Sequence, residues 1–294
     1  MKDQLGDRMK GNYEDRTRIS LPRRTYTIIR IDGKAFHTYT KGLKRPFDVG
    51  LISDMDATAA YLCKNIMGAK FAYVQSDEIS ILLTDFEDIG SQAWFDNNMQ
   101  KMVSVASSMA TSEFNKMRLL RACSVHLIDD QGKAHLSISS SEIEKFKLAE
   151  FDARVFQIPQ KTEVANYFIW RQQDATRNSI SSVAQSLYSH KELMGKSSNE
   201  KQEMIFQKGI NWGEDFTYRE KRGGIIGRVD YVNGEPADII TTEDYGDFYT
   251  PRGAMIDAIA IPKDAVVRSK WESIETPIFT QNQDFLYNLI PSNH

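Results

Sequence analysis

The sequence is poor in cysteine, lacks long apolar runs and carries no excess of positive charge. Cys63 and Cys123 are the only cysteines in 294 residues, and their spacing fits neither a zinc site nor a disulfide framework. Such a protein is expected in a reducing compartment, the cytoplasm. No run reaches the roughly 18 apolar residues that a membrane span requires, and the polar N-terminus lacks the apolar segment of a secretory signal. We therefore expect a cytoplasmic protein without membrane contact.

The net charge of −3 and the pI near 6.0 limit how this chain could bind nucleic acid. A protein that simply coats nucleic acid is usually basic overall, so any RNA contact here must use local basic patches. Taken singly, each basic cluster is more simply explained as a solvated surface. The clusters lie before the first expected strand, in the loop after it, and late in the chain: Arg16, Arg18, Arg23 and Arg24; Lys41, Lys44 and Arg45; Arg219, Lys221 and Arg222.

Hydrophobic periodicity predicts an α+β fold. The expected order is strand, helix, strand, strand, helix, strand, over residues 25–33, 49–67, 69–85 (two strands and a tight turn), 91–115 and 151–159. This is the βαββαβ pattern of a ferredoxin-like sheet. A further hairpin is expected between residues 123–128 and 134–139. Beyond Pro159 we expect a helix over 163–193, a polar stretch and, from about Gly224, an irregular tail with a few strands.

Two carboxylates occupy positions that a ferredoxin-like sheet brings together. Asp32 closes the first strand in the run IDGKAFH, and Asp77 lies in the hairpin turn of QSDE. Two carboxylates with phosphate oxygens can hold Mg²⁺, and two such ions polarise both the attacking and the leaving oxygens in phosphoryl transfer. Spacing alone leaves the alternative that Asp-Gly and Ser-Asp-Glu are only turn sequences.

The residues after Asp32 could form a cradle for phosphate. Gly33 allows close approach of the backbone. The His37 imidazole could contact phosphate, although a single histidine beside aromatic residues more often has a structural role. An anion-binding nest could be formed by the next four amides, those of Lys34, Ala35, Phe36 and His37.

Two features on the expected helices remain open. Lys101 lies on the second helix, where a solvated lysine is the default. Trp170, Arg171 and Asp174 in the run WRQQD either form a helix-packing and ion-pair cluster or face a substrate. Periodicity does not decide between these two interpretations.

Five motifs resemble those of the tRNA(His) guanylyltransferase superfamily. They are RIDGKAFHTYT, RPFD, YVQSDEISILL, FDARVFQIP and YFIWRQQDATRNS. The match runs in order from about residue 5 to residue 225, and the tail beyond is its weakest part. The pattern is most similar to that of the bacterial and archaeal guanylyltransferase-like proteins, which are 3′–5′ polymerases.

The resemblance implies a ferredoxin-like palm of the polymerase type over residues 1–160. A helical and irregular C-terminal region, residues 161–294, would pack on it as one structural unit. Two Mg²⁺ ions would be bound by Asp32, Gly33 and Asp77, with Glu78 in a supporting catalytic role. Other residues match positions that line the nucleotide and the tRNA-end sites: for the nucleotide, Lys34, Ala35, Phe36, His37, Arg45, Asp48, Ser76 and Lys101; for tRNA or its phosphates, Arg154, Lys201 and Asn211.

One departure from the family narrows the expected activity. Guanylyltransferases proper continue the WRQ helix with His-Ile-Asn-Asn-Leu-Tyr-Asn, where this chain has Thr176 for the histidine and keeps only Asn178. The guanylyltransferase-like proteins with this pattern restore missing 5′ nucleotides on truncated tRNAs by template pairing. We therefore expect ATP- or GTP-dependent activation of a tRNA 5′ end, followed by templated 3′–5′ addition. The resemblance also suggests a homotetramer, which would pool basic patches from several acidic subunits.

Three alternatives compete with this prediction. The enzyme could add G to the 5′ end of tRNA(His), as guanylyltransferases proper do. A nucleotide cyclase of the palm type would use the same acid pair without RNA. A non-catalytic tRNA-binding protein is disfavoured, because an unused pair of acids in a cleft would bring only repulsion.

Overall fold

The chain, seen in a computed structural model that describes residues 3–123, 146–232, 235–236, 248–249, 259–260 and 267–293, is built on one antiparallel sheet. The strands follow the order β4–β1–β3–β2–β5–β6, and β9 also pairs with β5. Their bounds are Tyr26–Gly33 (β1), Ala69–Gln75 (β2), Glu78–Leu83 (β3), Phe151–Ile158 (β4), Gly224–Val232 (β5), Glu235–Pro236 (β6) and Val267–Ile274 (β9). Two short strands, β7 (Phe248–Tyr249) and β8 (Ile259–Ala260), pair with each other.

The first four strands confirm the predicted order of elements. They alternate with α3 (Val49–Asn65) and α4 (Met99–Cys123) in the pattern βαββαβ, and they take the spatial order β4–β1–β3–β2. The apolar, β-branched run at residues 26–31 forms β1, an inner strand of the sheet that is paired on both sides. The predicted hairpin at 123–128 and 134–139 falls on residues outside the described part of the chain, apart from the helix end at Cys123.

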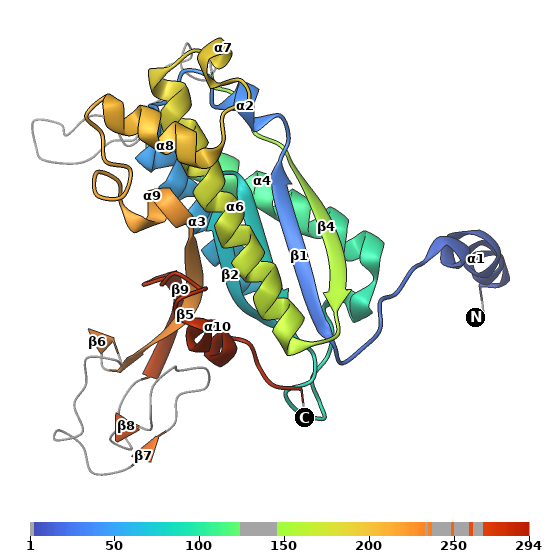
Figure 1. Cartoon of the computed structure of the whole chain (residues 1–294). Coiled ribbons are helices and arrows are strands. Elements are labelled where there is room, and N and C mark those ends of the chain that lie inside the picture. Colours follow the sequence, from blue (N-terminus) through green and yellow to red (C-terminus); the bar gives the residue numbers. More distant parts are fainter. Residues whose placement is uncertain are drawn as a thin grey trace, which may run out of the picture.

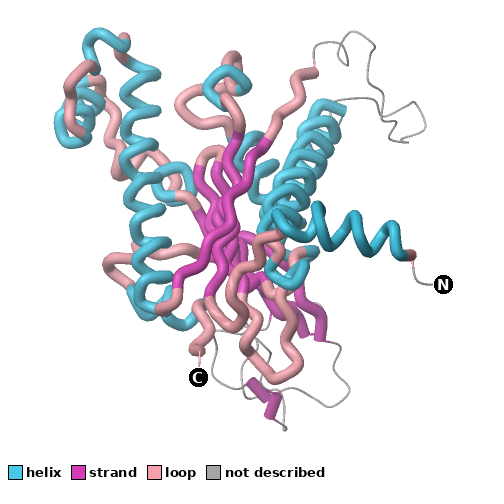
Figure 2. Tube along the Cα trace, turned by 90° about the vertical axis from the view of Figure 1, so that its right-hand side faces the viewer, coloured by secondary structure: helices cyan, strands magenta, loops and turns pink. Residues whose placement is uncertain are grey.

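Helices cover both faces of the sheet, which Figure 2 shows edge-on between them. Because side chains alternate along a strand, Ile29 and Ile31 of β1 face α3 and α4, whereas Tyr26 and Ile28 face α6 (Lys161–Leu187). The helix α6 crosses the sheet diagonally and leaves β1 and β4 visible beside it (Figure 1). A last helix, α10 (Gln283–Leu289), joins the core on the α6 face through Leu286.

Two expected helix boundaries were wrong. The helix expected over 91–115 begins only at Met99, because the preceding 3₁₀ turn η3 (Trp94–Asn97) has three residues with positive φ. The Asn98 side chain then accepts a hydrogen bond from the Lys101 amide at the helix start. The helix expected over 163–193 ends at Leu187, because Tyr188 is extended and Ser189 begins the short helix α7 (His190–Leu193) with a capping box.

The C-terminal half is more regular than expected. The polar stretch after α7 forms α8 (Ser198–Gln207), and α9 (Tyr218–Arg222) follows it. These helices pack on the end of α6 around a third buried cluster: Ile180, Val183, Ala184, Leu193, Ile205 and Trp212. Strand β5 pairs directly with β2. The sheet therefore includes strands from both expected regions, residues 1–160 and 161–294.

The N-terminal segment stands apart from the sheet. Helix α1 (Gln4–Met9) projects away from the rest of the chain (Figure 1), and a π-helical turn, η1 (Lys10–Glu14), and a 3₁₀ turn, η2 (Asp15–Thr17), lead back to it. In the part of the chain that the structure describes, no helix combines the length and apolar character that crossing a membrane demands.

Candidate active site

The end of β1 lies against the turn between β2 and β3, as the sequence predicts. Asp32 is directly opposite Glu78 in the β1–β3 ladder, and the Gly33 amide donates a 3.1 Å hydrogen bond to the carbonyl of Asp77. Ser76, at φ 46°, and Asp77 form the tight turn. Asp32 and Asp77 are therefore neighbours although they come from separate elements.

The acid pair sits in an environment that disfavours two free negative charges. Burial raises the pKa of Asp77, the charges of Asp32 and Glu78 add to that rise, and the Ser76 hydroxyl opposes it. The Arg154 guanidinium lies 4.0 Å from an Asp32 carboxylate oxygen and provides a partial counter-charge. A half-buried pair of carboxylates of this kind suits a hard divalent cation.

The available ligands suit Mg²⁺ better than an ion that is coordinated by protein side chains alone. Among the described residues, no group of three or more His, Cys, Asp or Glu side chains is placed to hold an ion. Mg²⁺ is commonly bound through one or two carboxylates, with water and substrate phosphates as its other ligands. Asp32, Asp77 and the Gly33 carbonyl are the groups that could hold it.

Gly33 is required by the close packing after β1. A Cβ at this position would lie 2.2 Å from the Phe36 ring. The chain then turns through Ala35, at φ 52°, into the short helix α2 (Phe36–Tyr39). The predicted nest is smaller than expected, because the Lys34 amide already donates to the carbonyl of Glu150. The amides of Ala35, Phe36 and His37 donate to no group in the described part of the chain.

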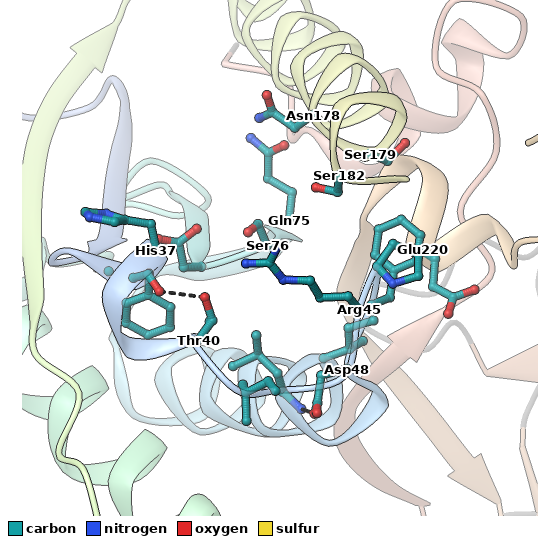
Figure 3. Close-up of a pocket in the computed structure, with 18 of the residues that line it drawn as sticks. His37, Thr40, Arg45, Asp48, Gln75, Ser76, Asn178, Ser179, Ser182 and Glu220 are labelled. Atoms are coloured by element: carbon teal, nitrogen blue, oxygen red, sulfur yellow. Dashed lines mark hydrogen bonds between the residues drawn. The ribbon is translucent and has the colours of Figure 1, made fainter. Parts of the chain in front are cut away.

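A cavity of about 630 Å³ opens beside the acid pair. Asp32, Asp77 and the α2 turn form one side of it, and the loop before α3 forms its floor. Figure 3 shows the Arg45 side chain reaching into the cavity toward Ser76. Of the predicted nucleotide-binding residues, six line it: Ala35, Phe36, His37, Arg45, Asp48 and Ser76. Asp48 also caps α3, since its carboxylate accepts from the Leu51 amide at 2.8 Å.

The opposite wall of the cavity was not recognised from the sequence. It comes from α6 and α9, and it is polar: Asn178, Ser179, Ser182 and Gln185 of α6, with Arg219 and Glu220 of α9. Figure 3 shows Asn178, Ser179 and Ser182 on this wall. Asn178, Ser182 and Gln185 recur at helical spacing. That spacing is visible in the sequence, but a polar helix face predicts exposure to solvent rather than a cavity wall.

Glu78 turns away from the acid pair into a buried ion pair. Its two carboxylate oxygens accept hydrogen bonds from Arg171 at 2.8 and 2.7 Å, and Arg171 also binds Asp174 at 3.0 Å. The open question about WRQQD is thereby resolved for Arg171 and Asp174, which form a helix-packing and ion-pair cluster. A supporting role for Glu78 remains a prediction.

Several predicted contacts lie outside the cavity. Arg154 is on β4 beside Asp32, and Lys34 pairs with Glu150. Lys101 lies in the first turn of α4, near Ile19 and Leu21, at the opposite end of the sheet from Asp32. Lys201 binds the Ser181 hydroxyl.

Two polar side chains instead organise local structure. The side-chain oxygen of Asn211 accepts from the Gly213 amide, so Asn211 shapes a loop. Thr176, which stands where guanylyltransferases proper have histidine, donates its hydroxyl to the backbone carbonyl of Gln172 and does not line the cavity.

Comparisons with known proteins agree on one family. Residues 6–159 match the family described as tRNAHis guanylyltransferase. The tRNA(His) guanylyltransferase of Debaryomyces hansenii is 26% identical over 221 residues, which are 71% of this chain and 76% of that protein.

Two solved structures are similar over almost the whole chain. A bacterial tRNA(His) guanylyltransferase-like protein in complex with ATP is 37% identical, with a TM-score of 0.72, over 97% of this chain and 99% of its own. Its counterpart in complex with GTP is 37% identical, with a TM-score of 0.67, over 98% and 99%. This chain belongs to the tRNA(His) guanylyltransferase family and is a nucleotidyltransferase.

Proposed function

We propose that this enzyme repairs 5′-truncated tRNA by template-dependent nucleotide addition in the 3′–5′ direction. The observation that carries the proposal is the acid pair, Asp32 and Asp77, at the edge of a cavity that Arg45 enters. Solved structures of bacterial family members in complex with ATP and with GTP have the same fold at 37% identity. The βαββαβ sheet would then serve as a palm of the polymerase type.

The reaction proceeds in two phosphoryl transfers. A 5′-phosphate oxygen of the tRNA attacks the α-phosphorus of ATP, and pyrophosphate leaves. The 3′-hydroxyl of an incoming nucleoside triphosphate then attacks the activated 5′ phosphorus, and AMP leaves. A tRNA that already has a 5′-triphosphate enters at the second step, and pyrophosphate is then the leaving group.

The residues of the site divide these tasks. Asp32, Asp77 and the Gly33 carbonyl would hold Mg²⁺, which when bound supplies the positive charge that lowers the pKa of the attacking hydroxyl and neutralises the leaving group. Arg45 grips phosphate oxygens with its planar guanidinium. The unused amides of Ala35 and Phe36 donate hydrogen bonds to further phosphate oxygens at the α2 turn.

Base pairing with the opposite tRNA strand selects the nucleotide that is added. Thr176, in place of the family's histidine, supports repair over untemplated addition to tRNA(His). Because the subunit carries a net charge of −3, binding of a whole tRNA by phosphate contacts favours an assembly of several subunits, a homotetramer, and a strong dependence on salt. We place this activity in the cytoplasm.

A comparison of two RNA substrates tests the proposal. With ATP, GTP and Mg²⁺, a tRNA that lacks its first nucleotide should be extended with a higher kcat/KM than full-length tRNA(His). We expect a preference of at least about ten-fold, since the missing first nucleotide leaves its Watson–Crick partner unpaired and available to template the addition. A preference for full-length tRNA(His), with one G added, would contradict the repair function.

A further inference from the structure

An exposed tryptophan of α6, Trp170, lies outside the cavity. Trp170 leaves 46% of its surface exposed to solvent. The Arg171 guanidinium lies 4.4 Å from the centre of its ring, and Tyr167 meets the ring at 5.9 Å in an edge-on contact. These contacts, one of them a cation–π interaction, hold the ring in one orientation. Trp170 is therefore a fixed aromatic surface rather than a mobile side chain.

The tryptophan is connected to the acid pair through a rigid chain of contacts. Arg171, which supports the ring, is buried and binds both carboxylate oxygens of Glu78. Glu78 is the chain neighbour of Asp77 and lies directly opposite Asp32 in the β1–β3 ladder. Only two side chains thus separate the Trp170 ring from the backbone that carries Asp77.

Two arginines place positive charge on the same side of the sheet. Arg154 is 55% exposed on its side chain and lies 4.0 Å from an Asp32 oxygen. Arg30 is directly opposite Arg154 in the β1–β4 ladder, so both side chains project from the same face. The Nε of Arg30 is buried and lies 4.0 Å from a Glu78 carboxylate oxygen, but it makes no hydrogen bond in the described part of the chain. Glu78 therefore balances the charge of Arg30 without satisfying its hydrogen-bonding capacity, which a phosphate oxygen would complete.

None of these three residues lines the nucleotide cavity, although Asp32 borders both places. We propose that Trp170, Arg30 and Arg154 form a second substrate site, the Trp170 surface, which binds the 5′-terminal nucleotide of the RNA. Its base stacks on Trp170, and its phosphate is held by the two arginines beside Asp32. The proposal rests on the proposed function, which makes RNA the second substrate. Stacking accepts any base, and it therefore suits a reaction in which pairing selects the nucleotide.

A fluorescent base at the RNA end tests this surface. A 5′-truncated tRNA with 2-aminopurine as its first nucleotide should lose fluorescence on binding to the wild type and to Trp170→Phe. The loss should be absent with Trp170→Ala. That variant should also raise the KM for tRNA by about ten-fold or more, with the KM for ATP and the melting temperature unchanged. Phe206→Ala, which removes an aromatic that is 63% exposed on α8, should behave as the wild type.

Two results would overturn the assignment. The first is quenching by Trp170→Ala equal to that of the wild type. The second is a smaller assembly for Trp170→Ala by light scattering, which would make Trp170 a subunit contact. A failure of the proposed function would look different. If the wild type quenches the probe through Trp170 but adds no nucleotide, the Trp170 surface stands and the proposed reaction is wrong. If Trp170→Ala extends tRNA normally and quenches the probe as the wild type does, the proposed function stands and the Trp170 surface is rejected.

Discussion

Replacing Asp77 by Asn is expected to reduce nucleotide addition by on the order of 10³-fold or more, because the site then loses a charged metal ligand at the reacting phosphate. The same change should raise the midpoint of thermal unfolding at pH 7 without Mg²⁺. Burial raises the pKa of Asp77, so its ionised form costs folding free energy at neutral pH, and Asn removes that cost. Activity and stability should therefore move in opposite directions.

The stability gained by Asp77→Asn depends on pH. A carboxyl whose pKa is raised by folding binds its proton more tightly in the folded state, so its destabilising effect is present above the raised pKa and is lost as the pH falls through it. The stability difference between Asp77→Asn and the wild type should shrink towards acid pH.

The matched control is Asp152→Asn. Asp152 lies opposite Asp32 in the β1–β4 ladder, pairs with Arg154 at 3.8 Å and does not line the cavity, so this variant should retain a near wild-type kcat at saturating tRNA. Equal losses of activity in both variants, or an active Asp77→Asn enzyme, would contradict the metal assignment.

Replacing Arg171 by Ala should cost about 3–5 kcal/mol of the free energy of unfolding, because the buried Glu78 carboxylate then keeps only Arg30, 4.0 Å away, as a charged partner. The side chains of Arg171 and Glu78 are only 7% and 9% exposed. Urea unfolding followed by circular dichroism would measure the loss. Changing both partners together, in Arg171→Met with Glu78→Leu, should recover much of it, since the buried carboxylate is then removed together with Arg171.

The control for this variant is Arg177→Ala, further along α6. Arg177 also pairs with Asp174, but 51% of its side chain is exposed, so Arg177→Ala should cost less than about 1 kcal/mol. A cost for Arg171→Ala no greater than that of Arg177→Ala would show that the Glu78 pair does not stabilise the fold. Nucleotide addition should fall with Arg171→Ala, because Glu78 anchors the turn that carries Asp77.

The sequence allowed the acid pair to be located because Asp32 lies at the end of a strand and Asp77 in the turn between two strands. Asp32 closes an apolar run and Asp77 interrupts another, so the βαββαβ order alone made them neighbours. The wall from α6 could not be found in that way. Polar residues such as Asn178 and Ser182 look the same on a helix that faces a cavity as on one that faces water.

Long-range partners explain the remaining differences. Arg171 and Glu78 are far apart in sequence, and only the packing of α6 on β3 unites them. The late start of α4 at Met99 places Lys101 at the far end of the sheet, because the turn before it, with Phe95 and Asp96 at positive φ, replaces the first expected helical turns. Local propensity does not report either effect.

The most direct test of the central claim follows the base that is added. The substrates are two 5′-truncated tRNAs that differ only in the nucleotide opposite the missing position, incubated with the enzyme, Mg²⁺ and all four nucleoside triphosphates. We predict that sequencing of the products shows a first added base complementary to the opposite nucleotide in each case, and no nucleotide product without RNA. Addition of G regardless of the opposite base, or a cyclic nucleotide made in the absence of RNA, would contradict the account.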